Sequence, residues 1–457
     1  KECPVENTRI QNLNSKPNLE GEYILYWMQQ SQRADFNPAL EYAVWQANRR
    51  QLPLIVVFGI TASYPEANIR HYRFMLEGLQ EIDEALNKRG IAFIVRFGHP
   101  PDVALEAATS AAMIICDRGY LRLQRQWRRP LAQGADCRVT QIEGDVIVPV
   151  ESASSKQEYA ARTIRPKLNH CYNTYLNHLV QTEIIKRNSD LNWPKLDLAD
   201  LDSIERKLNA DREARPVSSY SQGGTENAKR QFQHFFTTLL PYYQSHRNKP
   251  EANTVSRMSR YLHFGQISPV WLALQIEASD TSEDIRNAYI EQLLVRRELA
   301  INFVQYNDHY DSFEALPKWA RQTLAEHSRD QRSYIYSRDT LEAGATHDEY
   351  WNAAMQEMKV TGYMHNYMRM YWGKKILEWS NSPEEAYSNT LYLNNKYFLD
   401  GRDPVSYASV GWIFGLHDRP WQERPIFGKT RYMNANGLER KSDIKQYVKQ
   451  IKSLRQD

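Results

Sequence analysis

The stretch GYMHNYMRMYWGKKILEW, residues 362–379, concentrates aromatic side chains in a pattern that predicts one helix. It holds three tyrosines, three methionines and two tryptophans. Trp372 and Trp379 are seven residues apart, so they lie on nearly one face, about 10.5 Å apart along the axis. Such a file of rings is typical of a flat binding surface or a buried ring-shaped cofactor, and it is also typical of a helical core. The rest of the chain has to separate these interpretations.

The C-terminal end combines positive charge with aromatic residues. Residues 412–457 carry ten Lys/Arg against five acidic residues, a local excess of five in a chain whose formal net charge is +3. This composition suits a polyanion with stackable bases, and a solvated terminal helix is the alternative. The aromatic residues are Trp412, Trp421, Phe427 and Tyr432, and the basic residues are Arg419, Arg424, Lys429, Arg431, Arg440, Lys441, Lys445, Lys449, Lys452 and Arg455.

Length and composition limit the other possibilities. A chain of 457 residues predicts two domains or slightly more, and 42% hydrophobic with 25% charged residues is ordinary for a soluble globular protein. The four cysteines lie far apart with no CxxC or Cys/His spacing, so we expect a reducing, intracellular compartment and no metal site. No apolar run approaches the length of a membrane span, and neither a GxSxG motif nor a P-loop occurs. We expect a monomer with no membrane contact.

The first third of the chain alternates apolar runs with helical periods. Residues 66–90 predict an amphipathic helix that ends at Gly90. Strand–helix alternation predicts a doubly wound, parallel sheet, and the lack of GxGxxG after the first strand argues against a Rossmann-type dinucleotide site there. The predicted buried strands are YILYWM (23–28), LPLIVVFGI (52–60), IAFIVRFG (91–98) and MIICD (113–117).

We therefore expect an α/β domain over residues 1–150, an interdomain linker over 151–215 and an all-helical domain over 216–457. The linker is polar and loses the strand pattern, whereas helical periods dominate from about residue 225. The run RLQRQWRR (122–129) has arginines at helical spacing and is interpreted as a solvated face.

Specific motifs in the helical part resemble the class II cyclobutane pyrimidine dimer photolyases, within the photolyase and cryptochrome family. The likeness extends in order over nearly the whole chain. It implies an α/β antenna domain, a helical FAD-binding domain, and light-driven electron transfer from reduced FAD to a flipped-out pyrimidine dimer in DNA, which then splits. A second antenna chromophore is compatible with it, of unknown identity. The matching segments are ILYWMQQSQRADFNPAL (24–40), EYAARTIRPKL (158–168), SRMSRYLHFGQISP (256–269), VRRELAINFVQYNDHYDSF (295–313), MHNYMRMYWGKKILEW (364–379), YLNNKYFLDGRDPVSYASVGW (392–412) and HDRPWQERPIFGKTRYMN (417–434).

The resemblance assigns the FAD site to seven residues. Arg369 is expected to pair with Asp400 beside the isoalloxazine, in a charge-assisted contact whose alternative is a structural salt bridge. Ser256 and Ser259 precede an apolar helix as N-capping residues do, and an ordinary capped helix is the alternative for them. The full set is Tyr243, Ser256, Ser259, Arg369, Asn394, Asp400 and Asp403.

The resemblance also gives the aromatic helix a role. The family's photoreducing chain corresponds to Trp372, Trp351 and Trp379 in turn, so the rings become an electron relay if flavin is bound. Asn394 matches the residue near flavin N5, where an amide can accept or donate a hydrogen bond. Asn395 is equally available by residue type.

A DNA-binding surface is implied on the same domain. Extracting a dimer costs a few kcal/mol of unstacking, and one aromatic–base stack returns about 1–3 kcal/mol. Trp412 resembles the residue that stacks on the dimer, whereas Lys429, Arg431, Arg440 and Lys441 are expected to meet phosphates. Arg247 and Asn248 resemble polar contacts with the lesion, and Arg419 and Trp421 resemble the pair that enters the opened duplex beside it.

Three positions depart from the family. Gln292 replaces a glutamate that contacts the dimer, and an amide can donate a hydrogen bond but cannot transfer a proton. The loop from Trp412 to Asp418 is one residue shorter, and Glu151 stands where a tryptophan is common. Repair is the favoured hypothesis; a cryptochrome-type flavin light sensor and a DNA-binding protein without chemistry are the alternatives.

Overall fold

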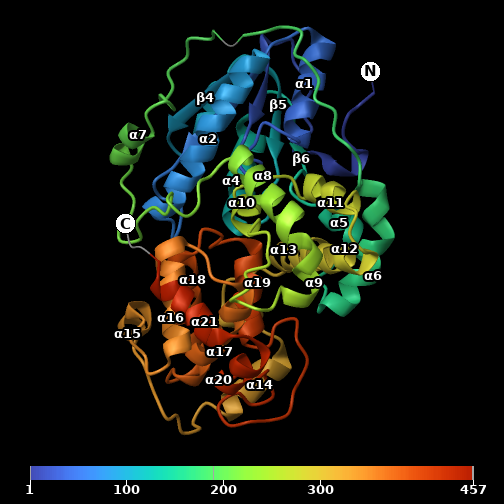
Figure 1. Ribbon diagram of the computed structural model, residues 1–457. Helices are drawn as coiled ribbons and strands as arrows, with labels where there is room; N and C mark the ends of the chain where they lie inside the picture. Colours follow the sequence, from blue (N-terminus) through green and yellow to red (C-terminus); the bar gives the residue numbers. More distant parts are fainter. Residues whose placement is uncertain (1, 189, 455–457) are drawn as a thin grey trace.

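The computed structural model describes residues 2–188 and 190–454, so Arg455 of the basic end lies outside the described part. Figure 1 shows two parts: a sheet flanked by helices, blue to teal, and a larger helical part that ends in red. This is the predicted fold class. Among the described residues, no helix combines the length and apolar character needed to cross a membrane.

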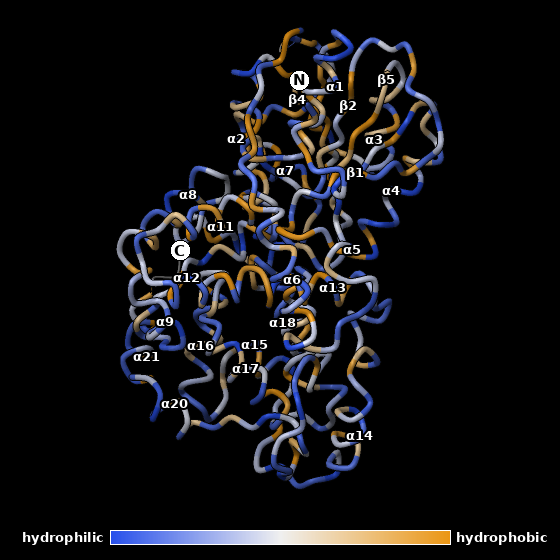
Figure 2. Tube along the Cα trace, turned by 90° about the vertical axis from the view of Figure 1, so that its right-hand side faces the viewer, coloured by the Kyte–Doolittle hydropathy of each residue, from blue (hydrophilic) through white to orange (hydrophobic). Residues whose placement is uncertain are grey.

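The sheet has six strands in the order β1-β6-β5-β2-β3-β4, and only the β1–β6 pair is antiparallel. All four predicted strands are present, and β1 and β6 were not predicted. Apolar residues gather along β2 and β5 (Figure 2), which are buried along their whole length. The strands are β1 (Ile10–Asn12), β2 (Tyr23–Trp27), β3 (Leu54–Ile60), β4 (Ala92–Phe97), β5 (Ala111–Asp117) and β6 (Val139–Ile142).

Helices cover both faces of this sheet because side chains alternate along each strand. Ile24 and Tyr26 pack on one face in a cluster that includes residues of α1 and α2. Leu25 and Trp27 pack on the other with residues of α3 and α4. As predicted, α2 ends at Gly90, whose φ of +76° suits glycine. The helices are α1 (Pro38–Arg50), α2 (Ile69–Arg89), α3 (Pro100–Ala107) and α4 (Arg122–Gly134), after a short 3₁₀ turn η1 (Asn7–Arg9).

The predicted linker, residues 151–215, is partly helical and partly extended. Its extended part runs along the α/β part, where Leu196 N donates to Val95 O, and Figure 1 shows it as a green trace passing around the sheet. Its helices are α6 (Ala161–Tyr172), the 3₁₀ turn η2 (Asn173–Tyr175) and α7 (Leu201–Lys207), and α5 (Val150–Ala153) stands at its start.

Helices make up most of the chain after residue 225, as predicted, but the predicted helix over residues 362–379 has other boundaries. Residues 362–379 do not form a single helix: Gly362, at φ +72°, ends α16, and α17 begins at Asn366. The elements are α8 (Thr225–His234), η3 (Phe235–Leu239), η4 (Leu240–Tyr242), α9 (Tyr243–His246), α10 (Ser259–His263), α11 (Pro269–Glu277), α12 (Glu283–Ile290), η5 (Glu291–Arg296), α13 (Arg297–Tyr306), η6 (Phe313–Ala315), α14 (Lys318–Glu326), α15 (Arg338–Ala343), α16 (Glu349–Thr361), α17 (Asn366–Glu378), α18 (Pro383–Tyr397), α19 (Pro404–Ile413), α20 (Ala435–Lys441) and α21 (Ile444–Lys452). Both η3 and η5 are π-helical.

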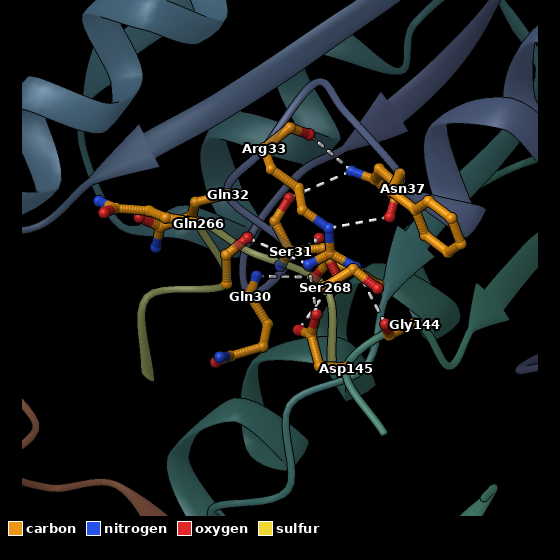
Figure 3. A network of polar contacts seen from close by, with 12 residues as sticks. Gln30, Ser31, Gln32, Arg33, Asn37, Gly144, Asp145, Gln266 and Ser268 are labelled. Carbon is orange, nitrogen blue, oxygen red and sulfur yellow. Dashed lines mark hydrogen bonds and ion pairs between the residues drawn. The ribbon is translucent and has the colours of Figure 1, made fainter. Parts of the chain in front are cut away.

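Polar contacts join the two parts. Arg33, fully buried, donates from Nη1 to Asp145 Oδ1 at 2.6 Å (Figure 3) and to Gly265 O at 3.0 Å. The interpretation of residues 122–129 as a purely solvated face is wrong, because Arg122 forms a bidentate ion pair with Asp311 at 3.0 and 3.1 Å. The arginine face of α4 therefore contacts the helical part.

Candidate active site

A cavity of about 960 Å³ opens in the helical part, at the upper end of the range for ligand sites. Its walls come from residues 159–165, 243–300 and 366–441. Four predicted residues are outside this lining: Trp351 and Trp379 are buried, and Lys429 and Arg440 are exposed. The predicted residues that line the cavity are Tyr243, Arg247, Asn248, Ser256, Ser259, Gln292, Arg369, Trp372, Asn394, Asp400, Asp403, Trp412, Arg419, Trp421, Arg431 and Lys441.

The cavity is cationic and offers unused hydrogen-bond donors. Eight arginines and one lysine line it, against three aspartates. Within the described part of the chain, Arg297 Nη1 and Trp372 Nε1 are buried without a hydrogen-bond partner. Because a buried unpaired polar group is costly, such donors suit a bound ligand that accepts hydrogen bonds. A large anionic cofactor such as FAD fits this volume and this donor set.

The pair of Arg369 and Asp400 forms as predicted. Arg369 Nη1 lies 3.1 Å from both carboxylate oxygens of Asp400. Burial would raise the pKa of Asp400, but the Arg369 guanidinium and the Ser259 hydroxyl hold that pKa below its ordinary value. The pair therefore presents a fixed carboxylate and guanidinium at the cavity wall.

The expectation that Ser256 and Ser259 act as N-caps is wrong. Helix α10 starts at Ser259 itself, and its capping position, Met258, makes no side-chain cap. Ser256 Oγ instead accepts a hydrogen bond from Tyr289 at 3.0 Å. Both residues line the cavity.

Asn394 and Asn395, equivalent by residue type, point to different places. Asn394 lines the cavity, and its Nδ2 donates to Asn395 Oδ1 at 3.1 Å, which leaves its amide oxygen as the acceptor for a ligand. Asn395 Nδ2 donates to Glu66 in the α/β part, and its Oδ1 accepts from Arg402 N. Asn395 therefore serves the structure.

Three tryptophans form a continuous file from the cavity into the protein. Trp372 lines the cavity, and the ring of Trp351 stacks on it with centroids 6.4 Å apart and planes at 12°. Trp379 contacts Trp351 in a T-shaped arrangement, with ring centroids 5.7 Å apart. Trp351 Nε1 donates to Trp372 O at 2.9 Å, which fixes the middle ring. Trp372 of α17 and Trp379, which follows the end of α17, thus connect through a ring on α16.

The file continues to the surface beyond Trp379, which is only 3% exposed. Tyr336 and His347 contact its ring edges at 5.4 and 5.1 Å. Tyr334, 45% exposed, stacks on His347 at 3.6 Å. Sequence reasoning missed these three residues, because only folding brings residues 334–347 beside the end of α17.

The predicted DNA residues cluster at the cavity mouth. Arg431 lies over both Trp412 and Trp421, at 5.5 and 4.4 Å from the ring centroids. Arg419 lies 3.8 Å over Trp421, whose Nε1 donates to Asp418 at 3.1 Å. The shortened loop still brings Arg419 and Trp421 to the cavity that Trp412 lines.

Gln292 faces the cavity from η5, whereas its neighbour Glu291 does not line it. Glu291 is held by Arg165, whose Nη2 donates to Oε1 at 2.5 Å. Because of this ion pair, Glu291 does not supply the carboxyl that Gln292 lacks. A π-helical turn is uncommon and often marks a functional position.

Comparison with known proteins agrees with this geometry. The family model described as DNA photolyase matches residues 24–184. The deoxyribodipyrimidine photo-lyase of Methanothermobacter thermautotrophicus is 48% identical over 455 residues, covering 98% of this chain and 99% of that protein. The chain belongs to the photolyase family. The deoxyribodipyrimidine photo-lyase of Arabidopsis thaliana is 38% identical, covering 94% of this chain and 89% of that one.

Solved photolyase and cryptochrome structures share the fold. A Synechocystis sp. PCC6803 cryptochrome has a TM-score of 0.72 at 17% identity, covering 95% of this chain and 90% of that chain. The archaeal photolyase from Sulfolobus tokodaii, solved with two FAD molecules, has a TM-score of 0.68 at 16% identity, covering 93% and 89%. Photolyases bind FAD, in agreement with the cavity's volume and donors.

Other cavity residues of this photolyase were missed from the sequence. Tyr159, Arg162 and Arg165 line the cavity; although the segment 158–168 resembles the family, it was assigned to the linker and no site residue was predicted in it. His417 also lines the cavity, and burial with the nearby Arg296 lowers its pKa to about 3. At neutral pH it is therefore an uncharged imidazole.

Proposed function

We propose that this protein is a class II photolyase that uses blue light to split cyclobutane pyrimidine dimers in DNA. One observation supports this above all. A single cavity joins the Arg369–Asp400 pair and Trp372, which suit a flavin, to Trp412 and Gln292, which suit a flipped-out lesion. The class II assignment rests on the MRMYWGKKILEW and LDGRDP motifs.

The cofactor is FAD, held by the cavity's donors. Ser256, Ser259, Tyr243 and Arg297, whose Nη1 has no partner among the described residues, bind its polar groups, and Asn394 offers an amide oxygen. The Arg369–Asp400 and His263–Asp403 contacts fix the surrounding wall, the latter at 2.9 Å. Bound FAD, in its reduced form, supplies the light-excited electron that splits the cyclobutane ring.

The tryptophan file carries electrons from the surface to the cavity. Trp379, Trp351 and Trp372 are buried and in ring contact, so solvent does not interrupt the path. We also propose that residues 1–150 form the antenna-type domain, 151–215 the crossing and 216–457 the catalytic domain, with Tyr159 to Arg165 of the crossing completing the cavity.

The DNA partner is bound at the cavity mouth. Trp412 stacks on the lesion, Gln292, Arg247 and Asn248 contact it, and Arg419 and Trp421 enter the space that it vacates. The basic side chains Lys429, Arg431, Arg440 and Lys441 contact phosphates. We propose that the enzyme acts as a monomer inside the cell, where its substrate is.

A second chromophore would belong between the two parts. A cavity of about 80 Å³ lies there, lined by residues such as Tyr64, His71, Trp127, His263 and Arg402. Since one water occupies about 30 Å³ of liquid, this space holds a few waters, and an aromatic chromophore requires the lining side chains to move.

The test is a repair assay on the purified protein. Bound flavin is confirmed by its absorption spectrum and photoreduced without oxygen, and the protein is illuminated with a single-stranded oligonucleotide carrying one thymine dimer. We expect intact thymines to be recovered. Photoreduction without recovery would reject repair and favour the cryptochrome-type light sensor, with Gln292 as the leading cause.

A further inference from the structure

Lys374 is a fully buried lysine in the middle of α17, two residues after Trp372. Its side chain is 0% exposed, and Nζ donates to Ile413 O, the last residue of α19, at 2.6 Å. Among the described residues, no carboxylate forms an ion pair with it. Because burying an unpaired charge is costly, this lysine requires an explanation beyond packing.

The same ammonium group lies beneath the ring that is proposed to receive the lesion. Lys374 Nζ is 5.2 Å from the centroid of Trp412, within the range of a cation–π contact. The two helices approach closely here, because a Cβ added to Gly373 would lie 2.6 Å from the Ile413 side chain. Lys374 therefore holds both the backbone that follows Trp412 and the ring itself.

We propose that Lys374 is a positioning residue for lesion recognition: it anchors the end of α19 and orients the Trp412 ring through its charge. The inference rests on the proposed function, since it assumes that Trp412 stacks on the dimer. Lys374 connects α17, which carries Trp372 of the electron relay, with α19, which carries Trp412.

The charge of Lys374 changes within the range of an ordinary buffer series. Burial lowers its pKa to about 7; Asp418 opposes this decrease and Arg431 adds to it. Below that pH the ammonium faces the ring, and above it the group is a neutral amine. The neutral amine still donates to Ile413 O, so raising the pH removes the ring contact and keeps the backbone anchor.

The experiment measures binding of a dimer-containing oligonucleotide and of the same undamaged oligonucleotide between pH 6 and 8.5. The ratio of the two affinities cancels the pH dependence of phosphate binding. For the wild type we expect this ratio to fall about three- to tenfold as the pH rises. Lys374→Met should have a low ratio that does not change with pH, with unchanged FAD content and photoreduction rate.

Two further variants make the test decisive. Lys375→Met is the matched control, because it removes the next lysine of α17, which pairs with Glu378 at 2.7 Å and lies over the rings of Tyr371 and Tyr432. It should keep the wild-type profile. Trp412→Leu removes the ring without touching Lys374, so its ratio should no longer depend on pH even if Lys374→Met fails to fold.

The possible results distinguish a failure of this inference from a failure of the proposed function. A wild-type preference for the dimer that is independent of pH, or a pH dependence that survives in Trp412→Leu, would overturn the role of Lys374 and leave repair intact. A flavin-loaded wild type with no preference for the dimer at any pH would refute the proposed function, and the inference with it.

Discussion

Replacing Arg33 with alanine should weaken both the contact between the two parts and the cofactor site. Arg33 Nη1 donates to Asp145 (Figure 3) and to Gly265 O, two residues after the end of α10. The two ends of α10, Ser259 and His263, contact Asp400 and Asp403, two of the three aspartates that line the cavity. Although Arg33 lies outside the cavity, its loss would therefore disturb the proposed flavin site through a movement of α10.

The expected loss in the free energy of unfolding depends on the polar groups that the substitution leaves without partners. Asp145 is 3% exposed and keeps a hydrogen bond from Ser31, at 3.1 Å, but loses its cation. Breaking a buried ion pair by removing one partner costs about 3–5 kcal/mol. The double variant Arg33→Met/Asp145→Leu removes both charges and leaves the Ser31 hydroxyl without its acceptor and backbone carbonyls such as Gly265 O without a donor, at a cost of about 1–3 kcal/mol.

Urea unfolding followed by flavin fluorescence and circular dichroism measures the difference. With an m-value of at least about 2 kcal/mol per M, the midpoint should fall by roughly 1–2 M in Arg33→Ala and by less in the double variant. Flavin release should begin at lower urea in both. A midpoint for Arg33→Ala within about 0.2 M of the wild type, or a double variant less stable than the single one, would refute this reasoning.

Three further predictions concern the cavity. Trp351→Phe should leave FAD content unchanged but slow photoreduction severely, because it replaces the only ring that contacts both Trp372 and Trp379 among the described residues; transient absorption with an unchanged rate would reject the relay. Gln292→Glu should raise the yield of dimer splitting per absorbed photon, since it restores a group that can donate a proton, and a lower yield would mean that the pocket has adapted to the amide. Arg369→Met should move the acid-induced release of flavin to higher pH. The pKa of Asp400 is depressed in the folded protein, so the stabilisation by its carboxylate is present above about pH 4 and is lost as the pH falls through the folded-state pKa. Removing the Arg369 guanidinium raises this folded-state pKa. Flavin fluorescence during an acid titration checks this, and an unchanged midpoint would contradict it.

The sequence predicted those strands well that are buried on both faces, because such strands are continuous runs of apolar residues. The strands β2 and β5 are buried on both faces, so they read as unbroken apolar runs. Strand β1, by contrast, has only three residues, Ile10–Asn12, two of which are exposed. Its pairing with β6 depends on partners about 130 residues away, which no local pattern encodes.

The candidate site was only partly predictable for the same reason. Residue types suggested a ligand, and the resemblance named Trp351, but only the fold shows its ring between Trp372 and Trp379. Arg162 lies in the matching segment 158–168, yet its place at the cavity was not predicted, because that stretch was assigned to the linker. Ser259 was misread as a cap because the sequence does not reveal that Met258 already occupies that position.

The measurement that tests the central claim most directly is repair itself. The photoreduced protein is illuminated with an oligonucleotide carrying one thymine dimer, and the recovered thymines are counted by chromatography against a dark sample and against Trp412→Ala. The account predicts light-dependent recovery in the wild type and a strong loss in Trp412→Ala. Complete photoreduction of the flavin without any recovered thymine would contradict it.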